Sequence, residues 1–99
     1  MIIKEVNEGK KIAYEVDGNR IYFGDDELML NLSKYERDAE VVINICMDSE
    51  HILTSSLSEY FVANIIIPAR AYEDAEKTKP IAFNMDNVTL MLWAIEEVA

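Results

Sequence analysis

The chain has a single cysteine, Cys46, so no disulfide within the chain is available to stabilise its fold. A lone thiol fits a reducing compartment, and we expect a cytoplasmic location. Only three glycines and two prolines occur in 99 residues, which argues against a long linker or a low-complexity tail. We therefore predict one domain, residues 1–99, with 51% hydrophobic residues to supply its core.

Long hydrophobic runs are also missing. Polar or rigid residues, Asn64, Pro68 and Arg70, interrupt the most apolar stretch, so no segment is long enough to span a bilayer. The first five residues already contain Lys4 and Glu5, and no apolar signal segment of the usual length follows. We expect no membrane partner.

Positive charge is scarce, because 9 basic residues stand against 19 acidic ones and the net charge is -10. A nucleic-acid-binding protein needs a basic face, so direct nucleic-acid binding is not expected. Attraction to anionic lipid is disfavoured for the same reason. The charge favours solubility and would favour a basic protein partner.

The clearest local pattern is an alternation of apolar residues on both sides of a turn, over residues 11–24. Asp-Gly and Gly-Asn both suit the positive φ angles of tight hairpin turns. A loop at residues 17–18 would place Tyr14 opposite Ile21, whereas a loop at residues 18–19 would place Val16 there. Either register predicts a β-hairpin with its aliphatic residues on one face.

Two segments fit both a strand and a helix. Residues 28–32 alternate leucines with other side chains, as in a strand, but Asp25 or Asp26 would also cap a helix there. Residues 88–95 are apolar on both strand faces, so they fit a central strand or a buried helix. We favour strands in both places.

Other strands are predicted at residues 2–6, at residues 40–47, briefly within residues 51–57, and at residues 60–72, with residues 33–39 as a loop. The stretches 60–72 and 80–95 are the longest apolar runs, and we expect them to form the central pair of a sheet. Pro68 would place its end of the strand at an edge or a bulge. The predicted fold is mainly β, a small antiparallel sandwich or open barrel built from hairpins. One short helix, giving an α+β fold, is the alternative.

Cys46, Asp48 and His51 are the only cluster with the spacing of metal ligands. A structural zinc site usually needs four Cys or His ligands, and the chain has one of each. The acidic runs at residues 25–27 and 48–50 lack the alternating oxygen ligands of a calcium loop. No metal site and no cofactor are therefore predicted.

Nucleophilic catalysis would need a base beside a nucleophile, and His51 is followed by Thr54, Ser55 and Ser56. No glycine-flanked nucleophile elbow surrounds these hydroxyls, and the chain contains no Gly-rich phosphate loop or dinucleotide fingerprint. We predict no catalytic, cofactor-binding or metal-binding residue.

Aromatic residues and one loop are candidates for contact with a partner. Trp93, Tyr60, Tyr72 and Tyr22 would serve as interface anchors, although Trp93 lies in an apolar run and is expected in the core. The polar connection at residues 73–79 is expected to be a hairpin tip that offers a contact surface.

Three functional hypotheses follow. The first is a non-enzymatic protein-interaction or assembly module, which predicts self-association or a defined protein partner. The second is an acidic inhibitor or nucleic-acid mimic that binds the phosphate-binding groove of a basic protein. The third is a small enzyme or metal protein that uses His51.

Overall fold

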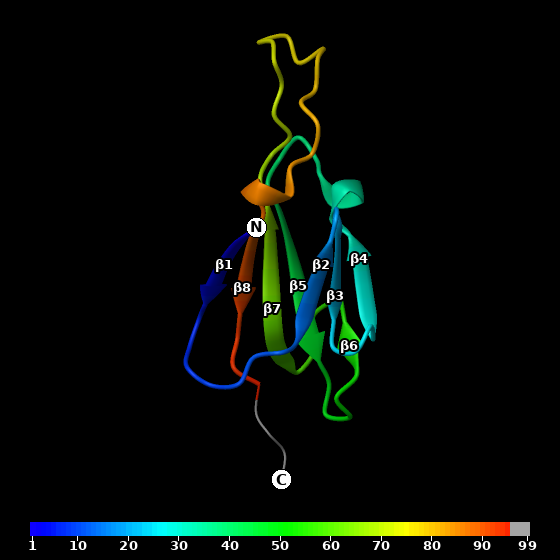
Figure 1. The fold of residues 1–99 in the computed structure, drawn as a ribbon, viewed down its shortest axis with the longest axis vertical. Coiled ribbons are helices and arrows are strands. Elements are labelled where there is room, and N and C mark those ends of the chain that lie inside the picture. Colours follow the sequence, from blue (N-terminus) through cyan, green and yellow to red (C-terminus); the bar gives the residue numbers. More distant parts are fainter. Residues whose placement is uncertain (96–99) are drawn as a thin grey trace.

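Two β-sheets face each other in the structure (Figure 1). A computed structural model of the chain describes residues 1–95. The larger sheet has five strands in the order β1-β8-β7-β5-β6, and the smaller has three in the order β2-β3-β4. The strands are β1 (Ile2–Glu5), β2 (Tyr14–Asp17), β3 (Arg20–Phe23), β4 (Leu28–Asn31), β5 (Val41–Met47), β6 (Leu53–Thr54), β7 (Tyr60–Ile67) and β8 (Thr89–Leu92). The predicted mainly β fold, built from antiparallel hairpins, is confirmed.

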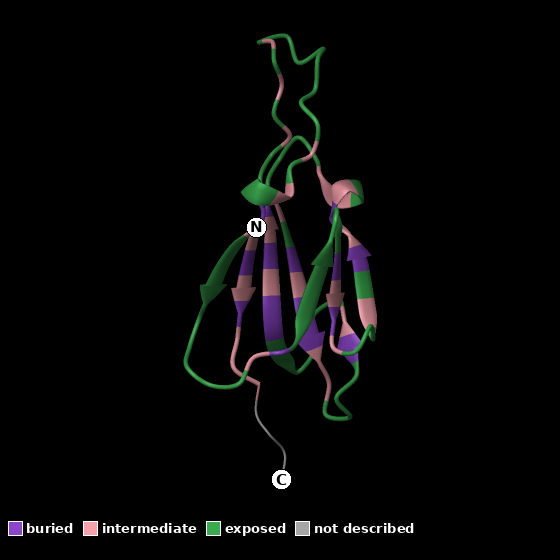
Figure 2. Ribbon diagram, in the orientation of Figure 1, coloured by how far each residue is buried: buried purple, intermediate pink, exposed green. Residues whose placement is uncertain are grey.

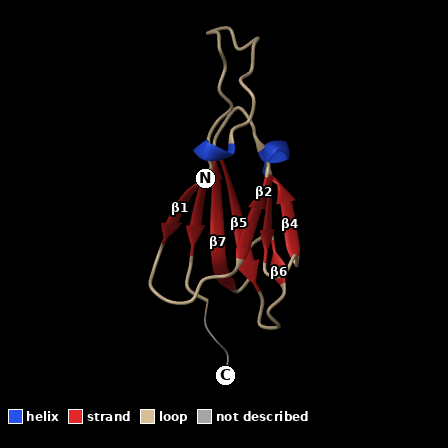
Figure 3. Cartoon of the chain, viewed as in Figure 1, coloured by secondary structure: helices blue, strands red, loops and turns tan. Residues whose placement is uncertain are grey.

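Helix is confined, within residues 1–95, to two short 3-10 turns, η1 (Leu32–Tyr35) and η2 (Met85–Asn87) (Figure 3). The first of them lies where we predicted a loop from residue 33. Asn84 caps the second turn, because its Oδ1 accepts a hydrogen bond from the Asp86 backbone N–H at 2.9 Å. Both segments that fitted either a strand or a helix contain a strand, as favoured. Both strands are shorter than the predicted segments, since β4 ends at Asn31, where η1 follows, and β8 covers only residues 89–92.

The core fills the space between the two sheets, and its side chains come from both (Figure 2). The smaller sheet contributes Ile21, Phe23 and Leu30, and the larger sheet contributes Ile43, Ile45, Val62, Ala63, Ile65, Ile67, Leu90 and Leu92. Most of the residues from the larger sheet occupy alternating positions on the neighbouring strands β5, β7 and β8. Period-two alternation therefore places one face of the larger sheet inward and the other outward.

The hairpin formed by β2 and β3 has the second of the two predicted registers. Val16 pairs with Ile21 and Asp17 with Arg20, which leaves residues 18–19 as the loop. Gly18 adopts a φ of 59°, a left-handed conformation that glycine tolerates without strain. All four residues of β2 are exposed, and β2 is one of the two edge strands of its sheet.

Strand β7 is the central strand of the larger sheet, and it is shorter than predicted. It ends at Ile67, and the exposed Pro68 follows it instead of lying within it. The β-bulge lies near the other end of β7. Ile45 pairs with Ala63 and Cys46 with Phe61, so Val62 is an extra residue in this strand. This bulge lets the consecutive residues Val62 and Ala63 both be buried.

The predicted pairing of the two longest apolar runs is present, since β7 pairs with β8. Only residues 89–92 of the second run form a strand, however. Its beginning is not part of the sheet, because Pro80 forms only an isolated bridge with Tyr72. One pairing differs from the antiparallel rule, as β1 lies parallel to β8 with Ile3 opposite Leu90.

Residues 68–84, between β7 and η2, leave the sheets as an extended arm (Figure 1). The arm lengthens the molecule, whose extents are 55 × 23 × 22 Å. Hydrogen bonds from Glu73 N to Lys79 O and from Ile81 N to Ala71 O join its two halves. The predicted hairpin tip at residues 73–79 is the far end of this arm.

Candidate functional site

Cys46, Asp48 and His51, which have the spacing of metal ligands, do not form a metal site in the structure. Cys46 is fully buried in β5, whereas His51 is exposed in the turn that follows, with a φ of 64°. The Asp48 carboxylate closes this turn by accepting hydrogen bonds from the backbone N–H groups of Glu50 and Ile52, at 2.9 and 3.0 Å. Within residues 1–95, no three His, Cys, Asp or Glu side chains are grouped so that they could hold a metal ion.

The hydroxyl groups near His51 bond to one another. Thr54 Oγ1 lies 2.9 Å from Ser56 Oγ and also accepts a hydrogen bond from Ser56 N. The acidic run at residues 25–27 is an exposed turn, in which Asp26 has a φ of 59°. The polar side chains of residues 54–56 and 25–27 therefore belong to local turns of the backbone.

The most distinctive surface is the outward side of the larger sheet. Pairing places Val42 beside Ile66 and Asn44 beside Asn64. On the other side of β7, Thr89 pairs with Ile66 and Met91 with Asn64. We call this set of six side chains the outer face: Val42, Asn44, Asn64, Ile66, Thr89 and Met91. None of them carries a charge.

The outer face is partly open to solvent. Val42 is 52% exposed, and the other five residues are half-buried. Ile2 on the neighbouring strand β1 extends the apolar surface, because it pairs with Thr89 and is 47% exposed. Lys4, two residues further along β1, pairs with Met91 and places one positive charge at the border of the outer face. The six residues of the face itself are uncharged, which is unusual in a chain with a net charge of -10.

A chain of hydrogen bonds crosses the outer face. Asn64 Nδ2 donates to Asn44 Oδ1 at 2.9 Å, and Trp93 Nε1 donates to Asn64 Oδ1 at 2.5 Å. The indole also stacks on Phe61, with ring centroids 5.7 Å apart and an interplanar angle of 27°. Trp93 is therefore half-buried beside the outer face, and the prediction that it packs in the core is wrong.

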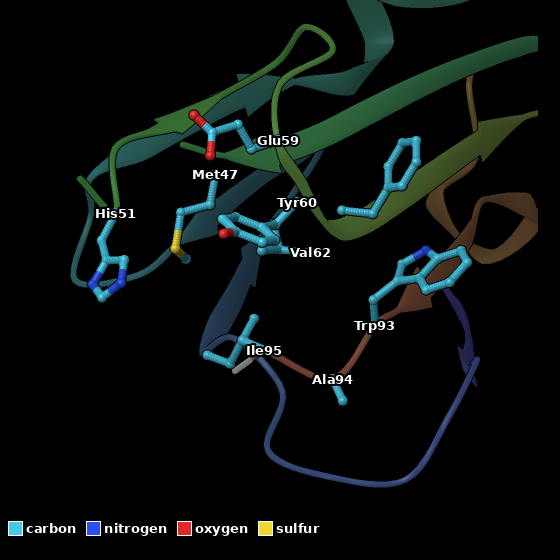
Figure 4. Close-up of a pocket in the computed structure, with 9 residues that line it drawn as sticks. Met47, His51, Glu59, Tyr60, Val62, Trp93, Ala94 and Ile95 are labelled. Carbon is cyan, nitrogen blue, oxygen red and sulfur yellow. The ribbon is translucent and has the colours of Figure 1, made fainter. Parts of the chain in front are cut away.

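A pocket of about 250 Å³ borders the end of this surface (Figure 4). Its aromatic lining residues are Tyr60, Phe61 and Trp93, and its polar ones are His51 and Glu59. In Figure 4 Tyr60 and Val62 overlap in the middle of the view, with His51 on one side of them and Trp93 on the other. The structure thus brings His51, Tyr60 and Trp93 to one pocket.

The arm is fixed at its base and at its tip. Arg70 contacts Glu36 and Asp38 through its guanidinium at 3.4 Å, and its backbone N–H donates to Arg37 O at 2.7 Å. Tyr72, and after it Glu36, raises the pKa of the Arg70 guanidinium, while desolvation opposes them. Tyr72 also donates its hydroxyl proton to Asp38 Oδ1. Tyr72 is therefore an anchor of the arm, away from the pocket.

At the tip, Asp74 organises the turn. Its carboxylate accepts hydrogen bonds from the Thr78 hydroxyl and from the backbone N–H groups of Thr78 and Lys79. The Thr78 hydroxyl, followed by these N–H groups, lowers the pKa of Asp74. Lys77 completes the turn with a φ of 57°.

The chain matches no protein-family model, no curated protein and no solved structure. Its function is therefore argued from the surface alone. The outer face was not predicted from the sequence, although neutral residues stand at alternate positions of β5 and β7. Within residues 1–95, no helix has the length and apolarity needed to cross a membrane.

Proposed function

We propose that this chain is a non-enzymatic protein-interaction module that assembles with a second copy of itself through the outer face. The observation that carries the proposal is the absence of charge from the six outer-face residues in a chain with a net charge of -10. Two copies of such an acidic chain repel each other over most of their surfaces. They meet without opposing like charges where their uncharged sheet faces pack together.

The side chains of the outer face support the same partner. Two sheets pack through side chains that interdigitate about 10 Å apart, and a two-fold axis presents the same patch on both subunits. Val42 and Ile66 would supply apolar area to this interface, and Asn64 Nδ2 already donates a hydrogen bond to Asn44 Oδ1 within the chain. The buried thiol of Cys46 supports assembly in a reducing compartment, and we propose the cytoplasm.

Light scattering at low and high salt tests the proposal. We expect a dimer at low salt that persists at high salt, because screening weakens the repulsion between acidic copies and leaves apolar contacts in place. A monomer at both salt concentrations would contradict self-assembly.

Charge insertion locates the interface. Val42→Glu places like charges opposite each other across the two-fold interface, and we expect the dimer to dissociate. Val16→Glu is the matched control, because Val16 is 40% exposed on β2 of the other sheet. Dissociation by the control, or a dimer that survives Val42→Glu, would place the interface elsewhere.

A further inference from the structure

The pocket at the end of the larger sheet has the chemistry of a site for a positively charged side chain. Three of its lining residues are aromatic, namely Tyr60, Phe61 and Trp93. Aromatic ring faces carry partial negative charge and attract cations such as ammonium and guanidinium groups. The remaining walls include the aliphatic side chains of Val62 and Ile95, which suit the apolar stem of a long cationic residue.

The contacts of Trp93 further restrict which kind of ligand the pocket suits. The indole N–H of Trp93 is already donated to Asn64 Oδ1 at 2.5 Å. Phe61 stacks against one side of the same indole, with centroids 5.7 Å apart. Trp93 therefore offers the pocket an aromatic surface and no free donor, so it favours a cation over an anion.

The charged residues around the pocket also favour a positively charged ligand. Glu59 lines the pocket, is exposed, and forms no ion pair with any residue of the described range 1–95. None of the described lining residues is Lys or Arg. The net charge of -10 also attracts a basic partner to the whole molecule.

We propose that this pocket binds an arginine or lysine side chain presented by a basic partner. The cationic head would lie against the Tyr60 and Trp93 rings near the Glu59 carboxylate, and its stem against Val62 and Ile95. The proposal does not depend on self-assembly, because none of the six outer-face residues lines the pocket.

Trp93 is the only tryptophan, so its indole N–H signal in an NMR spectrum reports on the pocket directly. The probes are acetyl-arginine amide, acetyl-lysine amide and the neutral analogue acetyl-norleucine amide. We expect the two cationic probes to shift the Trp93 signal saturably at low salt, and the neutral probe to bind several-fold more weakly. Absence of a saturable shift with both cations, or equal binding of the neutral probe, would overturn the proposal.

Two variants with matched controls test the assignment of residues. Glu59→Gln and Tyr60→Leu should each weaken arginine-amide binding by about fivefold, the size of one cation–aromatic or charge contact at an exposed site. Glu73→Gln makes the same charge change on the arm, and Tyr22→Leu the same aromatic change on β3; both should leave binding unchanged. Equal effects of variants and controls would place the binding elsewhere.

Val42→Glu separates this proposal from the assembly proposal. It should dissociate the dimer while the Trp93 titration keeps its midpoint, since Val42 does not line the pocket. A monomeric wild-type chain that still binds the cationic probes would retain the pocket proposal alone.

Discussion

Asn64 is the residue that connects the outer face to the pocket. Its amide nitrogen donates to Asn44 Oδ1 and its amide oxygen accepts from Trp93 Nε1. Both contacts are partly shielded from water, where a hydrogen bond is harder to replace than at the surface. The position of the Trp93 indole, and with it one wall of the pocket, therefore depends on a single polar side chain in the central strand.

Asn64→Ala should lower the free energy of unfolding by about 2 kcal/mol, because it removes two hydrogen bonds and leaves the Trp93 N–H without its partner. Asn44→Ala is the matched variant, since it removes only the Asn44–Asn64 bond and should cost about 1 kcal/mol. Urea unfolding measures both values. The reverse order of the two costs would contradict this account of the hydrogen-bond chain.

At the scale of the element, the outer part of the arm is held by local contacts, whereas Phe83 at its base packs against the core between the sheets. Its base is tied by Arg70 and Tyr72 to residues 36–38. Its tip is closed by Asp74, which accepts from Thr78 and Lys79. The arm is therefore expected to open at its tip without unfolding of the sheets.

Acid should open this tip. The pKa of Asp74 is lowered in the folded arm, chiefly by the Thr78 hydroxyl, so the carboxylate stabilises the tip above its ordinary pKa. That contribution is lost as the pH falls through the lowered value. The backbone N–H signals of Thr78 and Lys79 in NMR spectra should move together, with a midpoint below that of an ordinary aspartate.

Two variants check the cause of this transition. In Asp74→Asn the acid transition of Thr78 and Lys79 should vanish, whereas Glu73→Gln should retain it because Asp74 is intact. A midpoint at or above the ordinary aspartate value would show that the hydrogen bonds do not stabilise the charged carboxylate.

At the scale of the whole molecule, we expect most of the stability to come from the layer between the sheets, because the buried apolar side chains gather there. Ile65 in β7 is fully buried in this layer, whereas Ile81 on the arm is 45% exposed. The same substitution at the two positions therefore compares core packing with surface exposure. Small domains have a net stability of only about 5–15 kcal/mol, so a single core position matters.

Ile65→Ala should lower the free energy of unfolding by about 2–5 kcal/mol, through lost burial and the cavity left behind. Ile81→Ala should change it by less than about 0.5 kcal/mol, because the side chain is exposed and the backbone bond from Ile81 N to Ala71 O remains. Urea unfolding followed by circular dichroism measures both. Similar costs at the two sites would mean that the arm packs as part of the core.

Local chemistry was sufficient to predict much of the fold. The Asp-Gly-Asn turn at residues 17–19 predicted the hairpin, because only certain residues accept its left-handed backbone conformation. The alternating, β-branched residues at 40–47 predicted a strand, which is β5, and Ile43 and Ile45 of this strand are buried. These signals lie within a few residues of each other, so the sequence by itself contains them.

Contacts between distant segments decided the strand ends, the parallel pair and the candidate sites. Val62 is an extra residue only because β7 pairs with β5 in a particular register. Strand β1 lies parallel to β8 although 83 residues, 6–88, lie between the two strands. The pocket likewise forms where residues 47–62 meet residues 93–95.

The sequence by itself thus determined the mainly β class, the hairpin and the alternating core positions, because these follow from backbone conformation and period-two burial. Only the tertiary structure decided which neutral side chains form the outer face and that Trp93 lies outside the core. The physical reason is that strand register and order select which alternating faces become neighbours, and local periodicity carries no information about either.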